Sequence, residues 1–530
     1  ASCARDVKRS RLLRRWRDVS VACLVASAVA LGGCRSAPPA GPPPAPESAR
    51  PPAAAGPLAT LEAAVRDATR PDVSGFRLLE RNEDGLRWRL ALVDSARSTL
   101  DLQYYVWAGD TTGVLLMTHV VAAADRGVKV RMIIDDLDTM KKDADTSKVR
   151  DSPIAKIDRH PNIAIRLFNP WHNRSLVGRG VEAAGDLARL NHRMHNKLFV
   201  ADNRVAIIGG RNIGAEYLGL NPKYNFYDLD VLGVGPMARQ GSAVFDRYWN
   251  SPLAVEVDRL GLEATPGDLP EMMAKASARL ARAPELARFP LAPQDWTAEL
   301  DALPATLQPG QSRVVADRPG EESVRHWMPQ AIATLIGTAK RELLIANAYI
   351  IPDQNMIELL RDLTAHGVTV RILTNSLATT DVPAVNSHYK LWRRDLIEAG
   401  VELHELRPDA ALKVTAADTP PVSSVYLGLH AKAIVLDRER VFVGSMNLDP
   451  RSVEVNSEMG VVVESPGLGR IAAAAVEEAL KPENSWRVVL DPDGGLRWVA
   501  GAQVRRFQPA RSFWERVQDL LYMVFPRQLY

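Results

Sequence analysis

Two stretches of the chain repeat one pattern of reactive side chains: a His, a Lys two positions later, an Asp, then Gly-Gly or Gly-Ser and an Asn. The stretches are MHNKLFVADNRVAIIGGRN, residues 194–212, and LHAKAIVLDRERVFVGSMN, residues 429–447. The side chains that we take as catalytic candidates are His195, Lys197, Asp202, His430, Lys432 and Asp437. The same pattern in two matching frames indicates one shared chemical task.

In an extended strand, residues two apart project to the same face, so each His lies beside the Lys that follows it. A pocket built from both copies would hold two His, two Lys and two Asn, a set that suits a phosphodiester. The Lys and Asn side chains can donate to the non-bridging oxygens of a pentacovalent transition state without a metal. One His can attack phosphorus while the other protonates the leaving alkoxide. The residues expected to bind the substrate are Asn212, Asn447, Ser445 and Gly210.

Each member of the pattern also has a purely structural interpretation. A lone His or Lys on a strand is usually solvated or satisfied in the core, and Asp202 and Asp437 lie at turns, where Asp commonly bonds its own backbone. His192 is taken as a surface or supporting residue. A zinc site is disfavoured because the motif lysines would repel the cation, so neither a metal nor a cofactor is expected. The repetition at identical spacing favours the catalytic interpretation.

The elements that position these residues are duplicated too. LDLQYYVW, residues 100–107, and LLIANAYI, residues 343–350, both predict strands. Each is followed by a helix end, a Gly stop (Gly127, Gly367) and a second buried strand. Strands that alternate with helical segments predict an α/β fold, with mixed sheets flanked by helices in two equivalent domains.

The composition divides the chain into six segments. They are a signal segment (1–34), a Pro- and Ala-rich extended tether (35–57), a first α/β domain (58–250), a connector (251–312), a second α/β domain (313–475) and a C-terminal extension (476–530). The extension ends in an apolar stripe at helical spacing, residues 513–525. This stripe predicts a helix docked on the body, with a membrane-contacting face as the alternative.

The N-terminus has the pattern of a targeting segment. Basic residues precede the apolar run VSVACLVASAVALGG, residues 19–33, which is shorter than the about 20 apolar residues of a membrane span. LGGC, ending at Cys34, resembles a bacterial lipobox, which would make Cys34 the lipidated first residue of the mature protein. An ordinary signal peptide or an uncleaved anchor is the alternative. The expected location is the cell envelope, with the body anchored to a membrane and facing the periplasm.

The charge of the body argues against a nucleic-acid binder. The first 33 residues hold seven of the 66 Lys and Arg and two of the 63 Asp and Glu, which leaves 59 basic and 61 acidic residues. Proteins that bind nucleic acid usually carry a basic excess, because neutralisation of phosphates drives their affinity. No nucleic-acid partner is therefore expected.

The doubled motif resembles the signature of the phospholipase D superfamily, and the resemblance covers roughly residues 75–500. NHRMHNKLFVADNRVAIIGGRNIGAEY, TNSLATTDVPAV and AGVELHELRP are similar to bacterial cardiolipin synthases of the C-type branch. The resemblance implies two pseudo-twofold phospholipase D-like domains that share an active site at their interface. It also implies a two-step transfer through phosphohistidine, with His195 as nucleophile and His430 as general acid.

The resemblance further implies an acidic residue behind each His that orients its ring. Glu458 fits this role directly, and Asp228 in YDLDVLGV aligns with it although it lies sixteen positions after Asn212. The implied activity is a phosphatidyltransferase that makes cardiolipin from phosphatidylglycerol, with phosphatidylethanolamine as a candidate co-substrate. A hydrolytic phospholipase D is the alternative, ahead of a nuclease or a non-catalytic phosphate-binding module. A phospholipid bilayer is the expected partner, and the sequence does not indicate an oligomeric state.

Overall fold

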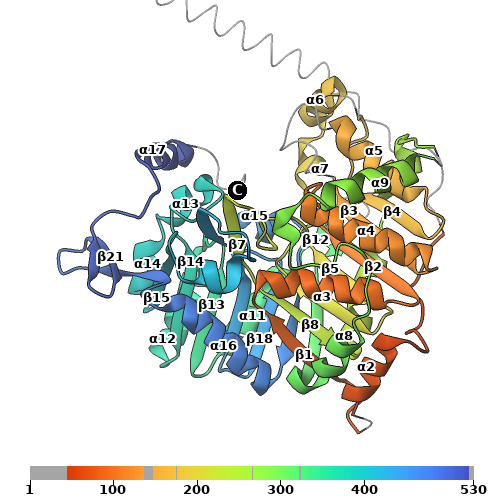
Figure 1. Ribbon diagram of the computed structural model, residues 1–530. Coiled ribbons are helices and arrows are strands. Elements are labelled where there is room, and N and C mark those ends of the chain that lie inside the picture. Colours follow the sequence, from red (N-terminus) through yellow and green to blue (C-terminus); the bar gives the residue numbers. More distant parts are fainter. Residues whose placement is uncertain are drawn as a thin grey trace, which may run out of the picture.

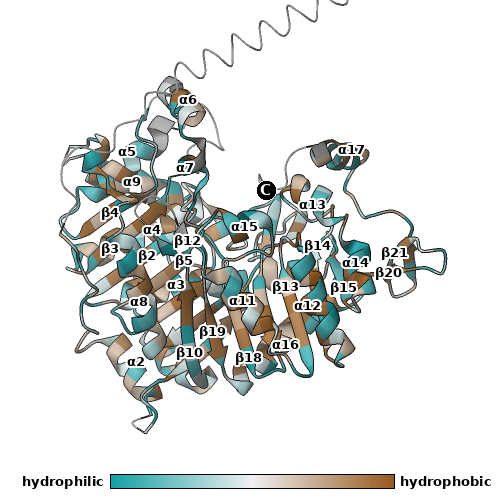
Figure 2. Cartoon of the chain, turned by 180° about the vertical axis from the view of Figure 1, so that it is seen from behind, coloured by the Kyte–Doolittle hydropathy of each residue, from teal (hydrophilic) through white to brown (hydrophobic). Residues whose placement is uncertain are grey.

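The computed structural model describes residues 45–67, 69–136, 147–174, 176–265, 267–320 and 324–524. The predicted signal segment and Cys34 lie outside the described residues. Figure 1 shows one large twisted sheet with helices on its faces, and chain segments that rise above one edge of it. Figure 2 shows that hydrophobic residues concentrate on the strands, whereas the helices carry much of the polar surface.

The first half of the sheet contains three parallel strands flanked by antiparallel ones. In spatial order the strands are β9 (Ala254–Glu256), β4 (Ile163–Phe168), β3 (Lys129–Asp135), β2 (Thr99–Tyr104), β5 (Lys197–Ala201), β6 (Val205–Gly209), β8 (Asp230–Val234) and β1 (Val73–Leu79). Only β2, β3 and β4 are mutually parallel in this set.

The second half repeats this order and these directions. Its strands are β10 (Gln308–Ala316), β19 (Met459–Glu464), β18 (Arg440–Gly444), β17 (Lys432–Leu436), β13 (Glu342–Asn347), β14 (Thr369–Asn375), β15 (Glu402–Leu406) and β20 (Ser485–Leu490). β1 and β10 pair antiparallel, with Val73 opposite Gln311, so the two halves form one continuous sheet about a pseudo-twofold axis. The predicted pair of equivalent α/β domains with mixed sheets is confirmed.

Six shorter strands complete the sheets. β21 (Leu496–Ala500) and β22 (Gln503–Arg505) extend the second half beyond β20. β11 (Arg318–Pro319) and β12 (Val324–Arg325) form a small hairpin. β7 (Tyr224–Tyr227) of the first half pairs in parallel with β16 (Tyr426–Leu429) of the second half. This last pair is a direct link between the halves outside the main sheet.

The helices are also repeated. They are α2 (Pro57–Val65), α3 (Asn82–Ser95), α4 (Thr111–Asp125), α5 (Ser147–Asp158), α6 (Leu176–Gly185), α7 (Leu187–Asn191), α8 (Pro236–Trp249), α9 (Asp268–Leu280), α10 (Thr297–Ala302), α11 (Met328–Ile336), α12 (Gln354–Ala365), α13 (Pro383–Tyr389), α14 (Arg393–Glu398), α15 (Pro450–Glu454), α16 (Pro466–Leu480) and α17 (Phe513–Leu521). The equivalent helices α4 and α12 each begin at an Asp cap and end at a Gly with positive φ, Gly127 at +98° and Gly367 at +84°. The predicted Gly stops are confirmed.

The core does not divide at the join between the halves. α8 of the first half packs on β10 of the second, and α16 of the second half packs on β1 of the first. One apolar cluster accordingly contains buried side chains of both halves, among them Phe76, Val231, Val461 and Leu468. Separating the halves would expose this cluster, so they form one folding unit around the site.

The domain limits differ from the predicted ones in three places. Residues 45–56 of the predicted tether are held against the first half: the Glu47 amide donates to Asn250, and the Ala53 amide donates to the Asp202 carbonyl at 3.1 Å. β9 extends the first domain past residue 250, and β20 places part of the predicted C-terminal extension in the main sheet. Among the described residues, no helix combines the length and the apolar character that crossing a bilayer requires.

Candidate active site

The two motif histidines lie where the halves exchange backbone contacts. The amide of His430, which follows β16, donates to the carbonyl of Tyr227, the last residue of β7, at 2.8 Å. At the equivalent place, the amide of His195 donates to the carbonyl of Ser457 at 2.8 Å. Tyr227 and Ser457 immediately precede Asp228 and Glu458. Each His is therefore held next to an acidic residue of the opposite half.

The two acidic residues contact the two imidazole rings in a crossed arrangement. His195 Nδ1 lies 2.9 Å from Glu458 Oε2, and His430 Nδ1 lies 2.6 Å from Asp228 Oδ2. Both carboxyl groups are fully buried, and the imidazole side chains retain only 10% and 7% exposure. When the carboxylate accepts a hydrogen bond from Nδ1–H of a neutral imidazole, Nε2 carries the free lone pair of the ring. Each half thus supplies the orienting acid for the other half's His.

Backbone pairing shows that Asp228 and Glu458 occupy equivalent positions. The Ser445 amide donates to the carbonyl of the residue after Glu458 at 2.8 Å, and the Gly210 amide donates to the residue after Asp228 at 3.2 Å. Gly210 has no room for a side chain, because a Cβ there would lie 2.2 Å from Asp228 Oδ1. In the other half, Ser445 uses this space to donate from Oγ to Glu458 at 2.5 Å. The Gly at 210 is therefore found beside the shorter acid, Asp228, and the Ser at 445 beside the longer acid, Glu458.

The motif lysines are buried and point back along their own strands. Lys197 Nζ donates to the carbonyl of His195 at 2.6 Å, and Lys432 Nζ donates to the carbonyl of His430 at 2.5 Å. Their exposed fractions are 1% and 0%. Burial lowers the pKa of Lys432 to about 8 and that of Lys197 well below its usual range, although nearby acids oppose both shifts. In their protonated form, the two buried lysines beside two imidazoles attract an anion, and a bound anion in turn favours that form.

Burial and the two lysines also shift the pKa values of the two dyads, His195 with Glu458 and His430 with Asp228. Burial lowers the pKa of His195 and of His430 well below 6.5, and the two lysines lower both further. Burial raises the pKa of Glu458 to about 8 and raises that of Asp228. Both imidazoles are therefore held neutral near pH 7, the form in which a ring nitrogen can act as a nucleophile.

Aromatic side chains outside the repeated motif flank the two imidazole rings. Tyr105 packs edge-on against His195 with 5.0 Å between ring centroids, and its ring lies 5.2 Å from Lys197 Nζ. Tyr217 and Phe226 contact His430 at 5.1 Å and 4.9 Å. The available signal was the aromatic content of LDLQYYVW and of the segment after the first motif, but sequence spacing cannot assign either to a ring.

Asp202 and Asp437 do not belong to this cluster, in contrast to the prediction of a catalytic role. Asp202 follows β5 at the end opposite Lys197 and accepts from the amides of residues 97–99 at 2.7–3.1 Å. Asp437 follows β17 and accepts from the amides of residues 340–342 at 2.7–3.2 Å. Both aspartates have left-handed backbone conformations, with φ of +53° and +55°. They hold the start of the neighbouring strand in place, about a hundred residues away in sequence, whereas the structural interpretation expected bonds to their own turn backbone.

The predicted substrate-binding residues have different surroundings. Asn212 Oδ1 accepts from the Val106 amide at 3.2 Å. The buried Oδ1 of Asn447 has no hydrogen-bond partner among the described residues. Ser445, expected to bind substrate, instead holds Glu458 and also accepts from the Met459 amide at 3.0 Å. Ser445 is therefore a positioning residue for the His195 dyad.

Polar side chains at the strand ends hold the start of each motif. Asp135, the last residue of β3, accepts from the Met194 amide at 2.8 Å. Asn375, the last residue of β14, accepts from the Leu429 amide at 2.9 Å and also donates to the Leu429 carbonyl at 2.8 Å. Met194 and Leu429 immediately precede the two histidines. The ends of the parallel strands thus set the position of both imidazoles.

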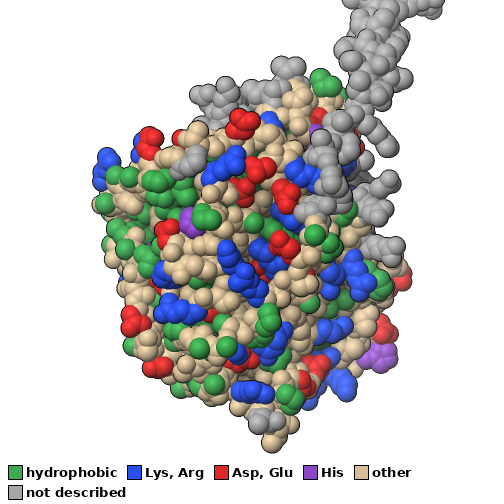
Figure 3. All heavy atoms as spheres, turned by 90° about the vertical axis from the view of Figure 1, so that its right-hand side faces the viewer, with side chains coloured by type: hydrophobic (Ala, Val, Ile, Leu, Met, Phe, Trp, Pro, Cys, Tyr) green, Lys and Arg blue, Asp and Glu red, His purple; other side chains and the backbone are tan. Residues whose placement is uncertain are grey.

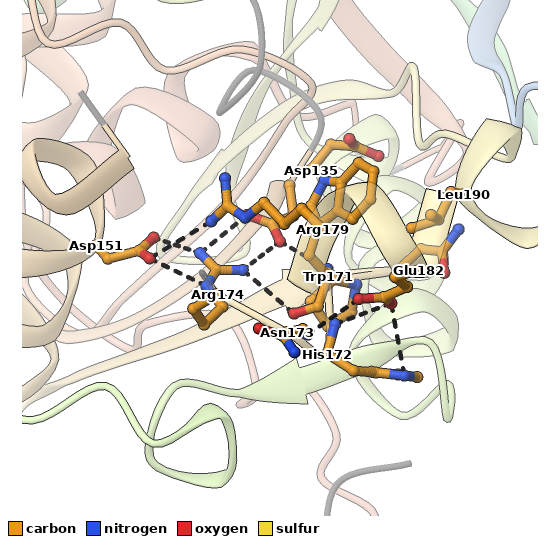
Figure 4. A network of polar contacts seen from close by, with 12 residues as sticks. Asp135, Asp151, Trp171, His172, Asn173, Arg174, Arg179, Glu182 and Leu190 are labelled. Atoms are coloured by element: carbon orange, nitrogen blue, oxygen red, sulfur yellow. Dashed lines mark hydrogen bonds and ion pairs between the residues drawn. The ribbon is translucent and has the colours of Figure 1, made fainter. Parts of the chain in front are cut away.

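The first motif is also preceded by a segment that an ionic network ties together (Figure 4). Arg174 lies between Asp136 and Asp151, with Nε 3.0 Å from Asp151 Oδ2. Glu182 of α6 accepts from the amides of residues 172 and 173 at 3.0 Å and pairs with Arg189 of α7 at 2.5 Å. These contacts fold residues 171–174 and 176–190 over the end of β3, beside the first motif.

Comparisons with known proteins agree with this site. The family model described as "Cardiolipin synthase, PLD-like domain" matches residues 90–249 and 332–481, and each match contains one motif. The chain is 34% identical to cardiolipin synthase C of Escherichia coli (strain K12), over 86% of this chain and 96% of the relative. It is 24% identical to cardiolipin synthase B of the same organism, over 78% of this chain and 84% of the relative.

A solved structure shares the fold. The crystal structure of phosphatidylserine synthase from Haemophilus influenzae Rd KW20 matches with a TM-score of 0.50 and 14% identity, over 79% of this chain and 89% of that chain. The two family matches, the long similarity to cardiolipin synthase C and the paired His sites together establish the family. The chain belongs to the cardiolipin synthase family of phospholipase D-like enzymes.

Proposed function

We propose that this enzyme is a phosphatidyltransferase that makes cardiolipin, with phosphatidylglycerol as acceptor and a second phospholipid as donor. The observation that carries the proposal is the pair of crossed His–acid dyads beside two buried lysines. The similarity to cardiolipin synthases over most of the chain supports a phospholipid as substrate. Phosphatidylglycerol and phosphatidylethanolamine are the candidate donors.

In the first step, Nε2 of His195 attacks the phosphorus of the donor, and the bond from phosphorus to the departing alkoxide breaks. His430 gives its Nε2 proton to that alkoxide, and the phosphatidyl group remains on His195. In the second step, the acceptor hydroxyl gives its proton to His430 and attacks phosphorus, which breaks the phosphorus–nitrogen bond. Lys197 and Lys432 stabilise the non-bridging oxygens in both steps.

The charge of the substrate supports the general-acid role of His430. Lys432 and Lys197 lower the pKa of the free imidazole. An anionic phosphodiester between these lysines offsets their charge, so the bound substrate raises the pKa of His430 toward the range in which it can hold a proton. Asp228, which accepts from Nδ1, stabilises the imidazolium in the same way.

The test uses the purified protein and vesicles of phosphatidylglycerol, with and without phosphatidylethanolamine, followed by mass analysis of the lipids. Cardiolipin is expected with the parent enzyme and is expected to be absent with His195→Ala and His430→Ala. An alkaline quench should reveal a phosphatidyl adduct on the parent chain that His195→Ala lacks. Phosphatidic acid without cardiolipin would identify a hydrolase, and unchanged lipids would contradict the proposal.

A nuclease is less well supported. On the outer face of the first half, Figure 3 shows acidic as well as basic side chains. Affinity for a nucleic-acid backbone depends on clustered positive charge. This agrees with the slight acidic excess of the chain after its first 33 residues.

We also propose that Cys34 is lipidated and anchors the enzyme to a membrane of the cell envelope, with the body in the periplasm. The LGGC sequence and the preceding apolar run support this proposal. Labelled palmitate should be incorporated into the parent protein in cells. Cys34→Ser should abolish the label, whereas labelling that persists in this variant would contradict lipidation at Cys34.

A further inference from the structure

The last helix of the described chain, α17, is docked with its polar side inward. Its sequence, FWERVQDLL, places Phe513, Trp514, Leu520 and Leu521 on one face and Glu515 and Asp519 on the opposite face. A surface helix of a globular protein normally buries the apolar face. Here the apolar side chains are 61–74% exposed, whereas Glu515 and Asp519 are 6% and 2% exposed. The predicted helix is present, but the face that docks it is the reverse of the one expected.

The inward face is held by specific polar contacts. Asp519 accepts from Asn386 Nδ2 of α13 at 2.6 Å and pairs with Lys390, the residue after α13, at 2.6 Å. Glu515 accepts from Arg511 Nη2 at 2.6 Å and from the Arg511 amide at 2.6 Å. Buried charged groups that are paired in this way fix the rotation of a helix, because turning it would leave them unpaired. The apolar face of α17 therefore points away from the body of the protein.

The outward side combines apolar groups with positive charge. Phe507 and Val504, just before α17, are 73% and 61% exposed. Arg516 of α17 is exposed, and the exposed Arg505 and Arg506 lie at and just after β22, where the Arg505 guanidinium is 4.8 Å from the Trp486 ring centroid. The acids of residues 504–523 are the two that face inward. An apolar helix face bordered by Arg516, with further arginines in the segment before it, is complementary to an anionic phospholipid surface, which takes the rings among the head groups and pairs with the cations.

A series of contacts leads from Arg511, just before α17, to the active site. Arg511 donates to the Thr380 carbonyl at 3.3 Å, and the adjacent residue Asp381 pairs with the Tyr349 hydroxyl. The Tyr349 ring lies 6.0 Å from Lys432 Nζ. Figure 1 shows α17 and α13 above the same edge of the sheet as β7 and α15, with α6 on the other side. The apolar face of α17 thus lies at the end of the molecule where the histidines meet.

We propose that α17 and the preceding segment, residues 504–523, form an interfacial membrane anchor that seats the active-site edge on an anionic phospholipid bilayer. The proposal rests on the proposed function, because it takes phospholipid as the substrate. A docked α17 brings the substrate head groups to the site. This contact is separate from the predicted N-terminal anchor.

The test measures docking at α17 itself. Cys3, Cys23 and Cys34 are changed to Ser in the full chain, and Leu520→Cys is labelled with an environment-sensitive nitrobenzoxadiazole probe. Ile471→Cys, an exposed apolar position on α16 with 43% exposure, provides the matched control. With vesicles of phosphatidylglycerol and phosphatidylethanolamine, emission at position 520 should shift to the blue and rise at least twofold. Emission at position 471 should not change.

Activity then separates docking from catalysis. Phe513→Ser with Trp514→Ser should lower cardiolipin formation on vesicles at least tenfold, while turnover of a short-chain, monomeric phosphatidylglycerol stays near that of the parent. Ile471→Ser should affect neither activity. If the parent enzyme transforms neither lipid form, the proposed function fails, and the probe still reports on docking.

Two outcomes would overturn the anchor. One is a probe at position 520 that does not respond to vesicles although the enzyme is active on them. The other is a blue shift that depends on protein concentration and occurs without vesicles, because a second copy of the chain would then cover the apolar face.

Discussion

The two halves of the enzyme share a backbone plan but not the side chains that complete it. In the first half, Gly210 leaves room for the short acid Asp228, which is directed at His430. In the second half, Ser445 supports the longer acid Glu458, which is directed at His195. The pseudo-twofold axis therefore relates two dyads that are equivalent in position but different in chemistry. In the proposed two-step transfer the two imidazoles have different tasks, since one bonds to phosphorus and the other moves a proton.

Removal of either imidazole should have the largest effect. His195→Ala and His430→Ala should each lower kcat about a thousandfold or more, because positioned acid–base catalysis alone contributes about a hundredfold to ten-thousandfold. The measurement is the initial rate of cardiolipin formation, with far-ultraviolet circular dichroism to verify folding. If only the His195 variant also lacks the phosphatidyl adduct, the two imidazoles have different roles. Equal adduct formation in both variants would contradict the assignment of His195 as nucleophile.

Neutralising the orienting acids should come next. Above pH 8, where Glu458 with its pKa of about 8 is ionised, Asp228→Asn and Glu458→Gln should each lower kcat about a hundredfold with little change in KM, because the isosteres remove the charge that stabilises the imidazolium and leave the pocket intact. Steady-state kinetics on phosphatidylglycerol vesicles provide the values. Because each acid contacts the His of the opposite half, Asp228→Asn should resemble His430→Ala in adduct formation. Glu458→Gln should resemble His195→Ala. A match within each half instead would contradict the crossed arrangement.

An exchange of the residues beside the acids tests the difference directly. Gly210→Ser should reduce activity about a hundredfold, because its Cβ alone would lie 2.2 Å from Asp228 Oδ1 and would displace that carboxylate. Ser445→Gly should reduce activity only about tenfold, since it removes one hydrogen bond to Glu458 and creates no clash. The ratio of the two losses, measured by initial rates, is the informative quantity. Equal losses would mean that the two positions are interchangeable.

The pH dependence of stability should distinguish Glu458 from a surface acid. Folding raises the pKa of Glu458 from 4.5 to about 8. The stability contributed by such a group is present below pH 4.5 and is lost as the pH rises toward 8. Glu458→Gln should therefore gain stability relative to the parent between pH 5 and pH 8, as measured by chemical denaturation. A constant difference across this range would contradict the raised pKa.

Asp437 should show the opposite sign and the smallest effect on activity. Backbone amides of residues 340–342 lower the pKa of Asp437, although burial opposes the shift. The stabilisation is therefore present above pH 3.8 and is lost as the pH falls below it. Asp437→Asn should lower the free energy of unfolding by about 1–2 kcal/mol at pH 7 and leave kcat within about twofold. A loss of activity comparable to that of the histidine variants would restore Asp437 to the catalytic set.

The sequence was sufficient to predict the α/β class and the duplication, and the motif repeat predicted that the two His and two Lys lie together between the halves. The spacing of the motif is a local property, but the strands themselves begin only at the lysines, β5 at Lys197 and β17 at Lys432, so each His precedes its strand and does not lie within it as predicted. The same local logic placed the Gly stops after α4 and α12. Asp202 and Asp437 were catalytic candidates only because the repeated pattern includes them. Their position at the far end of β5 and β17 separates them from the site.

Only the tertiary structure decided which acid serves which imidazole and which way α17 faces. Asp228 and His430 are 202 positions apart, and Glu458 and His195 are 263 apart. Their contacts depend on the pairing of β7 with β16 and of Met194 with Ser457, whose register no local pattern specifies. For α17, the sequence determined that two faces exist. Ion pairs to α13 and Arg511 determined which face is buried, because the energy of a paired charge depends on a partner that only the folded chain supplies.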